Sequence, residues 1–293
     1  LEHHTYQLME IRGFGFETVD KLARQMPDFK PDSIVRIIAS LTFLFERAES
    51  RGHVCLPKDD LIKQMIALLN NQFPNAVNEE KCRQALNLAY KQETIKVTSG
   101  MVYTKRSYDQ ETGIVKDIQR LMTTHPHKIS NIDDFIKQYE DENGVTLADS
   151  QKEAVRSSFR NQVNIITGGP GTGKTTILRG ILELYGRMEL TALLAAPTGR
   201  AAKRLQEVTG QEACTIHRLL ESQPDPATGR LIFTRDEDNP LKAHAVIVDE
   251  TSMVDISLLA SLLRALPPGC RLILVGDPDQ LPPVGPGCPL SDM

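Results

Sequence analysis

The stretch Val163-Asn164-Ile165-Ile166-Thr167-Gly168-Gly169-Pro170-Gly171-Thr172-Gly173-Lys174-Thr175-Thr176 decides the fold. Its first five residues are mostly apolar and β-branched, as in a buried strand, and the residues from Lys174 to Met188 are spaced as in a helix. Between them lies G-x-x-x-x-G-K-(S/T), the pattern of a phosphate-binding loop, in the strand-to-helix context that it requires. The flanking elements disfavour the alternative, a glycine-rich turn with a solvated lysine.

The glycines of this loop allow main-chain N–H groups to turn toward phosphate oxygens at the positive end of the following helix. Lys174 is expected to neutralise the β- and γ-phosphates, and the Thr175 hydroxyl to ligate magnesium. ATP and Mg²⁺ are therefore the expected cofactors. The other expected nucleotide contacts are Gly169, Pro170, Gly171, Thr172, Gly173 and Thr176.

Short apolar strands alternate with helices after the loop. The expected strands are Val163–Thr167, Ala192–Ala196, Ala245–Val248 and Leu272–Val275, and the expected helices are Lys174–Met188, Arg200–Val208 and Ile256–Leu266. Apolar strands that alternate with helices indicate a parallel sheet covered on both faces, which is an α/β fold.

Two carboxylates follow the strand Ala245–Val248, at the end where ligands bind in open α/β sheets. Asp249 is expected to hold magnesium, and Glu250 to activate the attacking water as general base. A plain polar cap on the strand is the alternative, but the phosphate loop about 75 residues earlier favours the catalytic interpretation.

The segment Gly276-Asp277-Pro278-Asp279-Gln280-Leu281-Pro282-Pro283-Val284 follows the last expected strand. Gln280 would place an amide where it could sense the γ-phosphate and couple hydrolysis to movement. A proline-stiffened turn is an equally good chemical explanation of the same residues.

The N-terminal part has a different pattern. A helix is expected over 33–50, with apolar residues at i, i+3, i+4 spacing. A short extended segment, two helices near 58–69 and 79–91, and a hairpin that turns at Ser99-Gly100 follow. This order is the plan of a winged helix. Residues 109–150 are polar and indicate a helical connector.

Composition excludes several classes of protein. The 293 residues include 40% hydrophobic and 25% charged residues, typical of a globular protein with a real core. No apolar run approaches the roughly 18 residues of a membrane span, and no secretory signal is apparent. Five cysteines without a C-x-x-C pair disfavour a zinc or disulfide scaffold and favour the cytoplasm.

Six ordered motifs together resemble the first motor domain of superfamily-one DNA helicases, most closely the RecD-like branch that includes the exodeoxyribonuclease V alpha subunit. The motifs are Gln151, the phosphate loop, 196–202, 215–220, 249–255 and 276–284. The resemblance implies a RecA-like P-loop domain with a parallel sheet. It also implies an ATP-dependent helicase that moves from the five-prime toward the three-prime end of single-stranded DNA.

The resemblance further implies roles for single residues. Gln151 would recognise adenine, Lys174, Asp249 and Glu250 would be catalytic, and Gln280 would couple nucleotide state to DNA. The residues that would contact DNA are Pro197, Thr198, Gly199, Arg200 and His217. For His217 alone, a core or solvated histidine is the alternative. The implied partners are single-stranded DNA, duplex ends and recombination or repair subunits, without a membrane.

The segment Ile11–Leu22 resembles a helix-hairpin-helix element, in which Gly13 and Gly15 would let main-chain amides approach a DNA phosphate. Val19 stands where a small alanine is usual. A simple glycine turn before a helix remains a competing interpretation.

These observations predict four parts: a helix-hairpin-helix remnant at 1–30, a winged-helix-like domain at 31–108, a helical connector at 109–148 and a RecA-like motor domain at 149–293. Helicases of this kind continue into a second motor domain, so this chain is expected to bind nucleotide but hydrolyse it poorly. A turn at 225–229 is expected to tip a duplex-splitting hairpin. The alternatives are a non-catalytic DNA-binding scaffold with a nucleotide switch, and the helicase part of a conjugative relaxase.

Overall fold

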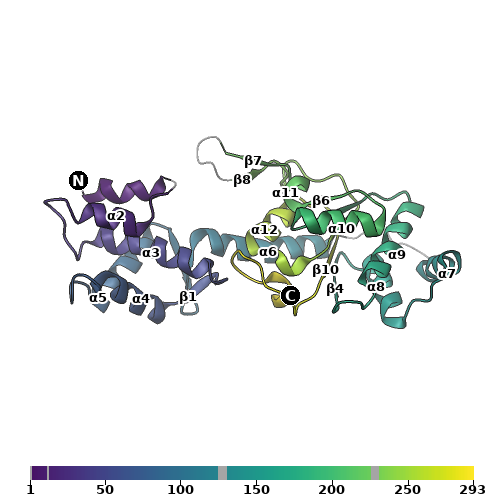
Figure 1. Cartoon of the computed structure of the whole chain (residues 1–293), viewed down its shortest axis with the longest axis horizontal. Coiled ribbons are helices and arrows are strands. Elements are labelled where there is room, and N and C mark those ends of the chain that lie inside the picture. Colours follow the sequence, from purple (N-terminus) through teal and green to yellow (C-terminus); the bar gives the residue numbers. More distant parts are fainter. Residues whose placement is uncertain (1, 12, 125–130, 226–230) are drawn as a thin grey trace. The chain divides into compact units, whose positions relative to one another are not determined.

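The computed structural model describes residues 2–11, 13–124, 131–225 and 231–293. The chain divides into two compact units. Unit 1 comprises residues 1–110 and 284–287, and unit 2 comprises residues 111–283 and 288–293. The boundary falls within helix α6 (Lys105–Thr123), as Figure 1 shows.

Unit 1 contains the expected helix, strand, helix, helix and hairpin, preceded by shorter helices. Its elements are α1 (Glu2–Gln7), η1 (Leu8–Glu10), α2 (Phe16–Ala23), α3 (Ile34–Glu49), β1 (Cys55–Pro57), α4 (Lys58–Asn70), α5 (Glu79–Lys91), β2 (Ile95–Thr98) and β3 (Met101–Thr104). The three strands pair antiparallel in the order β1-β3-β2. The predicted order of these elements is therefore confirmed.

The turn of the predicted hairpin explains why the sequence reveals it. Ser99 and Gly100 both have positive φ, 48° and 79°. Two central residues with positive φ define the type I′ turn, whose twist matches that of paired strands. Thr98 and Met101 are consequently paired across the turn.

The helices before and after residue 30 share one hydrophobic core. Phe16 and Val19 of α2 are buried in the same cluster as Ile37 of α3, Leu61 of α4 and Leu86 of α5. The predicted boundary at residue 30 is thus not a break in packing, because α2 has too few apolar residues to form a core of its own. Unit 1 packs as a single body.

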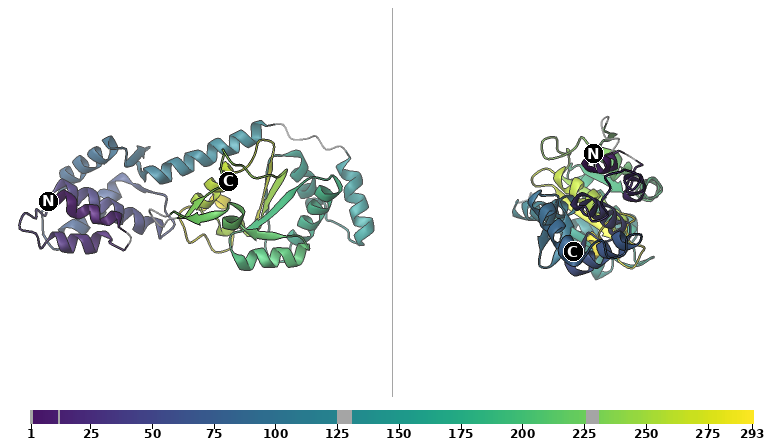
Figure 2. Two further views of the ribbon diagram at one scale, coloured as in Figure 1. Left: turned by 90° about the horizontal axis from the view of Figure 1, so that it is seen from above. Right: turned by 90° about the vertical axis from the view of Figure 1, so that its left-hand side faces the viewer.

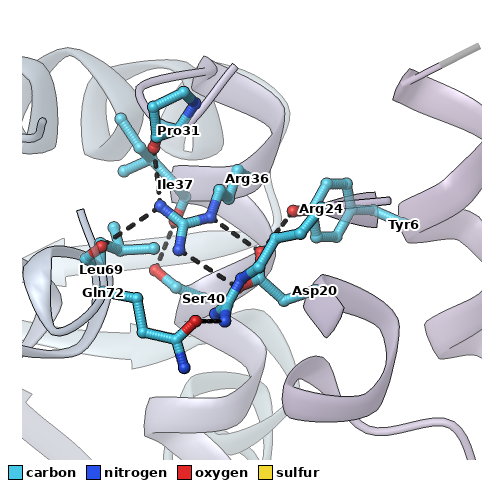
Figure 3. Close-up of polar contacts among 9 residues, drawn as sticks. All are labelled: Tyr6, Asp20, Arg24, Pro31, Arg36, Ile37, Ser40, Leu69 and Gln72. Atoms are coloured by element: carbon cyan, nitrogen blue, oxygen red, sulfur yellow. Dashed lines mark hydrogen bonds and ion pairs between the residues drawn. The ribbon is translucent and has the colours of Figure 1, made fainter. Parts of the chain in front are cut away.

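A buried ion pair joins α2 to α3 within this core. The Arg36 Nε donates to Asp20 Oδ1 at 2.7 Å, and a second guanidinium nitrogen donates to Asp20 Oδ2 at 3.1 Å. Both side chains are almost fully buried. Figure 3 shows the guanidinium also reaching the main-chain oxygens of Pro31 and Leu69, at 2.6 and 3.3 Å. One arginine thereby connects α2, α3, the loop between them and α4.

Further donors complete the coordination of the carboxylate. The Tyr6 hydroxyl of α1 donates to Asp20 Oδ1 at 2.6 Å, and Arg24 Nε donates to Asp20 Oδ2 at 3.0 Å. Arg24 also donates to Gln72, just beyond α4 (Figure 3). Burial by itself raises the pKa of Asp20, but the hydrogen bonds from Arg36, Tyr6 and Arg24 outweigh it and hold this pKa below 3.8.

Unit 2 is built on a sheet of five parallel strands among the described residues. Their order is β4 (Val163–Thr167), β10 (Arg271–Gly276), β9 (Ala245–Val248), β5 (Ala192–Ala196) and β6 (Ala213–Thr215). Figure 2 shows helices on both sides of these strands. The α/β fold expected from the alternating pattern is confirmed.

The helices of unit 2 after α6 include the three expected at 174–188, 200–208 and 256–266, together with others that were not predicted individually. The described helices are α7 (Ile132–Asn143), α8 (Asp149–Arg160), α9 (Lys174–Arg187), α10 (Gly199–Thr209), α11 (Ile216–Leu219), η2 (Thr251–Met253), α12 (Ile256–Arg264) and α13 (Pro289–Asp292). Among the described helices, none combines the length and apolarity that crossing a membrane requires.

The structure differs from the sequence prediction in the region before α8. Ile136 and Tyr139 of α7, together with Leu147, are buried in the same core as the apolar residues of α9. The polar composition of this region hid these few apolar positions. Residues 132–147 consequently pack against the core of unit 2 and do not form a separate connector.

A small antiparallel hairpin, β7 (Ser222–Pro224) with β8 (Leu231–Phe233), interrupts the α/β alternation. Leu231 and Ile232 are exposed on it. The turn expected to tip this hairpin, at 225–229, lies outside the described residues except for Asp225.

The Asp20 cluster predicts a measurable loss of stability on substitution. Asp20→Asn removes the charge that compensates the buried Arg36, and breaking a buried ion pair in this way costs about 3–5 kcal/mol. Urea denaturation at pH 7, with hydrogen exchange to localise the transition to 2–110, measures it. Because the pKa of Asp20 is lowered by folding, its stabilisation is present above about pH 4 and lost on acidification.

The difference between the wild type and Asp20→Asn should therefore shrink below pH 4. Asp28→Asn, at an exposed position close by, is the matched control and should change little. Equal stabilities of the wild type and Asp20→Asn at pH 7 would contradict the assigned role of the cluster.

Candidate functional site

The parallel register brings three loops to one edge of the sheet. β10 lies between β4 and β9, with Gly276 opposite Thr167 and Leu274 opposite Val248. The Gly168 N–H donates to the Gly276 oxygen at 3.3 Å, which continues the pairing one residue past β4. The phosphate loop, the Asp249-Glu250 pair and the segment from Asp277 onward therefore start side by side, where ligands bind in open α/β sheets.

The phosphate loop folds around its own lysine. Gly171 and Gly173 have φ values of 77° and 84°, a region that favours glycine. The Lys174 Nζ donates to the main-chain oxygens of Gly168 and Gly169, the latter at 3.0 Å. The Thr172 hydroxyl donates to the Gly169 oxygen at 2.9 Å. The ammonium group is thus held over the loop at the first residue of α9.

The remaining loop residues lie where the sequence predicts. Pro170 and Thr175 are exposed, whereas Thr176 is half-buried in the first turn of α9. The Thr175 side chain has no hydrogen-bond partner within the described part of the chain. Its hydroxyl therefore remains available to a ligand.

Asp249 lies next to this loop in a half-buried position. Its N–H donates to the Ala195 oxygen of β5 at 3.0 Å, which fixes the residue beyond the end of β9. Burial is the main cause that raises the pKa of Asp249, and the charge of Glu250 adds to it. The positive charges of Lys174 and Arg204 act in the opposite direction. Asp249 follows β9 and Lys174 follows the loop after β4, the two strands that flank β10, and their charges interact.

Glu250 adopts an unusual main-chain conformation directly after Asp249. Its φ of 54° lies in the left-handed region, which is strained for a residue with a side chain and recurs at functional sites. The buried Thr251 hydroxyl fixes this bend, since it contacts the oxygens of Val248 and Val275 at 3.0 Å each. Sequence reasoning did not single out Thr251, and only its place after the acidic pair could have indicated it.

Gln151, in the first turn of α8, also reaches the phosphate loop. Its Nε2 donates to the Thr172 oxygen at 3.2 Å, and its Oε1 accepts from the Ala148 N–H at 3.0 Å. Gln151, which is expected at the nucleotide, therefore contacts a residue of the phosphate loop that lies 21 positions later in the sequence.

The structure does not bring the Gln280 side chain into contact with the phosphate loop or with the Asp249-Glu250 pair. Gln280 is exposed, and its side chain has no hydrogen-bond partner in the part of the chain that the structure describes. Its N–H donates to the Asp277 oxygen at 3.1 Å. Asp277 itself is 4% exposed and accepts from the Asp279 N–H at 3.1 Å, so it shapes the turn that carries Gln280.

The residues expected at DNA follow the two neighbouring strands β5 and β6, which pair through Ala196 and Thr215. After β5, Thr198 caps α10 by accepting from the Ala201 N–H at 3.2 Å. Pro197 is half-buried beside it, whereas Gly199 and Arg200 are exposed. After β6, the half-buried His217 ring lies 5.8 Å from that of Phe233 in β8. These residues share one edge of the sheet.

Gly13 and Gly15 belong to unit 1 and are not part of this edge. Gly13 has a φ of 97°, and Gly15 is the residue before α2. No atom would contact a Cβ at either position, so space is not the reason for these glycines.

Gly276 provides a direct test of how tightly the edge is packed. A Cβ there would lie 2.7 Å from Leu290 Cδ2 and 3.2 Å from the main-chain nitrogen of Ser252. Gly276→Ala should therefore destabilise the chain by about 1–3 kcal/mol, the usual cost of overpacking. Chemical denaturation measures it. Gly186→Ala in α9, where nothing lies within 4 Å, should be neutral or stabilising; equal effects of the two substitutions would contradict this packing.

Two families match parts of the chain. Residues 151–286 match the family described as AAA domain, and residues 1–55 match the ATP-dependent RecD2 DNA helicase HHH domain. The second match extends past residue 30 and through α3 to the first residue of β1, in agreement with the shared core of unit 1.

Curated relatives match more of the chain. It is 33% identical to the ATP-dependent RecD2 DNA helicase of Deinococcus radiodurans, over 99% of this chain and 40% of that protein. It is 31% identical to the RecBCD enzyme subunit RecD of Mycolicibacterium smegmatis, over 90% of this chain and 49% of the relative. The ATP-dependent DNA helicase dda of Enterobacteria phage T4 is 38% identical over 48% of this chain and 34% of its own length.

The chain thus spans less than half the length of each of these relatives. The matches cover both units, and the residues of the phosphate loop and of the acidic pair fall inside the AAA region. The chain belongs to the RecD-like family of DNA helicases.

Proposed function

We propose that the chain is a nucleotide- and DNA-binding part of an ATP-dependent DNA helicase. The observation that carries this proposal is that Lys174 and Asp249 both follow the carboxyl ends of strands in one parallel sheet, where their charges interact. A cation and a carboxylate in this arrangement suit a triphosphate and its metal ion. Two relatives that are named ATP-dependent DNA helicases, RecD2 and dda, support the same conclusion.

ATP would bind across the phosphate loop. Its phosphates would displace the loop oxygens from the Lys174 ammonium, which lies at the positive end of α9. Main-chain N–H groups of the loop would add further donors. The residues proposed to line the triphosphate are Gly169, Pro170, Gly171, Thr172, Gly173, Lys174, Thr175 and Thr176.

Asp249 and the Thr175 hydroxyl fit Mg²⁺, because both supply hard oxygen ligands and Mg²⁺ keeps several waters of its own. Burial raises the pKa of Asp249, and a divalent cation bound there would offset the cost of burying its charge. Mg²⁺ would neutralise the charge that develops on the phosphates. Glu250 would then orient and deprotonate the attacking water.

Single-stranded DNA would lie along the edge formed after β5 and β6. Arg200 is exposed there without an ion pair in the described part of the chain, and the α10 N-terminus offers main-chain donors. His217 and Phe233 supply ring surface on which bases stack. The exposure of Leu231 and Ile232 supports a role of the β7–β8 hairpin in separating a duplex end. Binding of this kind weakens steeply with salt.

The remaining assignments complete the proposal. Gln280, on its exposed turn, would report the nucleotide state to DNA, and movement would run from the five-prime toward the three-prime end. Gly13 and Gly15 of unit 1 would add a contact to the DNA backbone. Recombination or repair subunits are the proposed protein partners, and five cysteines without a C-x-x-C pair fit a cytoplasmic location.

Titration with a fluorescent ATP analogue and Mg²⁺, with and without single-stranded DNA, tests the proposal. Lys174→Ala should weaken binding at least about tenfold, because hydrogen bonds to a charged group are lost. Single-stranded DNA should shift the nucleotide affinity of the wild type and bind less tightly as salt increases.

Lys63→Ala in unit 1, at a well-exposed lysine, is the matched control and should leave nucleotide binding unchanged. Nucleotide binding that survives in Lys174→Ala would contradict the assigned phosphate site. Lysine-dependent binding that is indifferent to DNA would leave a nucleotide switch and remove the support for a helicase.

A further inference from the structure

The side-chain amide of Gln151 is held by two main-chain groups. Its oxygen accepts from the Ala148 N–H at 3.0 Å, at the start of α8, and its nitrogen donates to the Thr172 oxygen at 3.2 Å. The amide nitrogen also occupies the space into which a Cβ at Gly173 would project. Gln151 therefore bridges two segments of unit 2 and covers one face of the phosphate loop.

This contact fixes the orientation of a particular peptide. In a trans peptide the C=O and the N–H point in opposite directions. The bond from Gln151 to the Thr172 oxygen consequently turns the Gly173 N–H away from Gln151. Gly173 needs its φ of 84° to adopt this orientation directly before Lys174, and a side chain would both strain this conformation and overlap Gln151.

We infer that Gln151 is a positioning residue that braces the phosphate loop and acts on the triphosphate through the Thr172–Gly173 peptide. The inference rests on the proposed nucleotide site. A preorganised loop binds phosphate with less loss of conformational freedom than a loop that must be ordered by the ligand. The loss of this brace therefore weakens every ligand that carries the phosphate chain, with or without a base.

The brace leaves part of the amide available. A glutamine amide has two N–H groups and an oxygen with two lone pairs, and the two bonds use one of each. Recognition of the base by the other N–H would add a contribution to the affinity for nucleotides alone. Comparison of a nucleotide with a phosphate chain that lacks a base separates the two effects.

The test is displacement of a fluorescent ATP analogue by ATP and by inorganic tripolyphosphate, each with Mg²⁺. Gln151→Met keeps the length of the side chain but removes both hydrogen bonds. It should weaken tripolyphosphate about threefold to tenfold, which corresponds to the loss of about one neutral hydrogen bond, and ATP by at least this factor. Ser150→Ala, at the exposed neighbouring position of α8, is the control and should leave both affinities unchanged.

Gln151→Glu divides the bridge into its two halves. The carboxylate still accepts from the Ala148 N–H but cannot donate to the Thr172 oxygen. Its negative charge also repels the Thr172 oxygen and the phosphates, so Gln151→Glu should weaken both ligands at least as much as Gln151→Met. Hydrogen exchange of the amides at 168–173, measured without any ligand, should be faster in both variants than in the wild type and in Ser150→Ala.

Weaker binding of ATP with unchanged tripolyphosphate would overturn the inference and assign Gln151 to the base. Unchanged binding of both ligands and unchanged exchange would overturn it as well. Failure of the proposed nucleotide site gives a different result, since wild-type binding would then be indifferent to Lys174→Ala. The exchange measurement decides on the brace even in that case.

Discussion

The proposed nucleotide site depends on one constraint, the parallel pairing of β10 with both β4 and β9. This pairing places the phosphate loop, the acidic pair and the turn of Gln280 at the ends of adjacent strands, and the Gly168–Gly276 hydrogen bond continues it into the loop. Thr251 then ties the bend after the acidic pair to the oxygens of both β9 and β10. Distant segments thus meet without any direct bond between their functional side chains.

Unit 1 depends on a different kind of interaction. Its core is made of small helices, and the buried Asp20 carboxylate draws α1, α2 and α3 together through Tyr6, Arg24 and Arg36. The Arg36 and Arg24 guanidinium groups also lie over the Phe73 ring at 5.6 and 5.7 Å. A buried charge is favourable only when it is fully compensated, so these helices are fixed in their mutual arrangement. The glycine turn before α2 is therefore presented by a rigid support.

Local patterns revealed most of the elements, because each has a strong signal. The loop glycines, the strand-end Asp249 and the Ser99-Gly100 turn need only a few neighbouring residues to be recognised. The brace by Gln151 and the burial of Tyr139 in the core of unit 2 depend on residues far apart in the sequence. The Asp20–Arg36 pair was missed for the same reason, since each residue alone resembles a surface charge. Side-chain contacts of this kind follow from the packed fold and not from periodicity.

The phosphate loop and Asp249 are proposed to act on the same metal–nucleotide complex. The affinity for ATP, measured as a function of free Mg²⁺ in the wild type and in Asp249→Asn, tests this proposal. Mg²⁺ should strengthen ATP binding to the wild type, and Asp249→Asn, which preserves the shape of the side chain, should lose most of that dependence. The same dependence on Mg²⁺ in both proteins would show that Asp249 does not hold the metal ion, and would contradict the account.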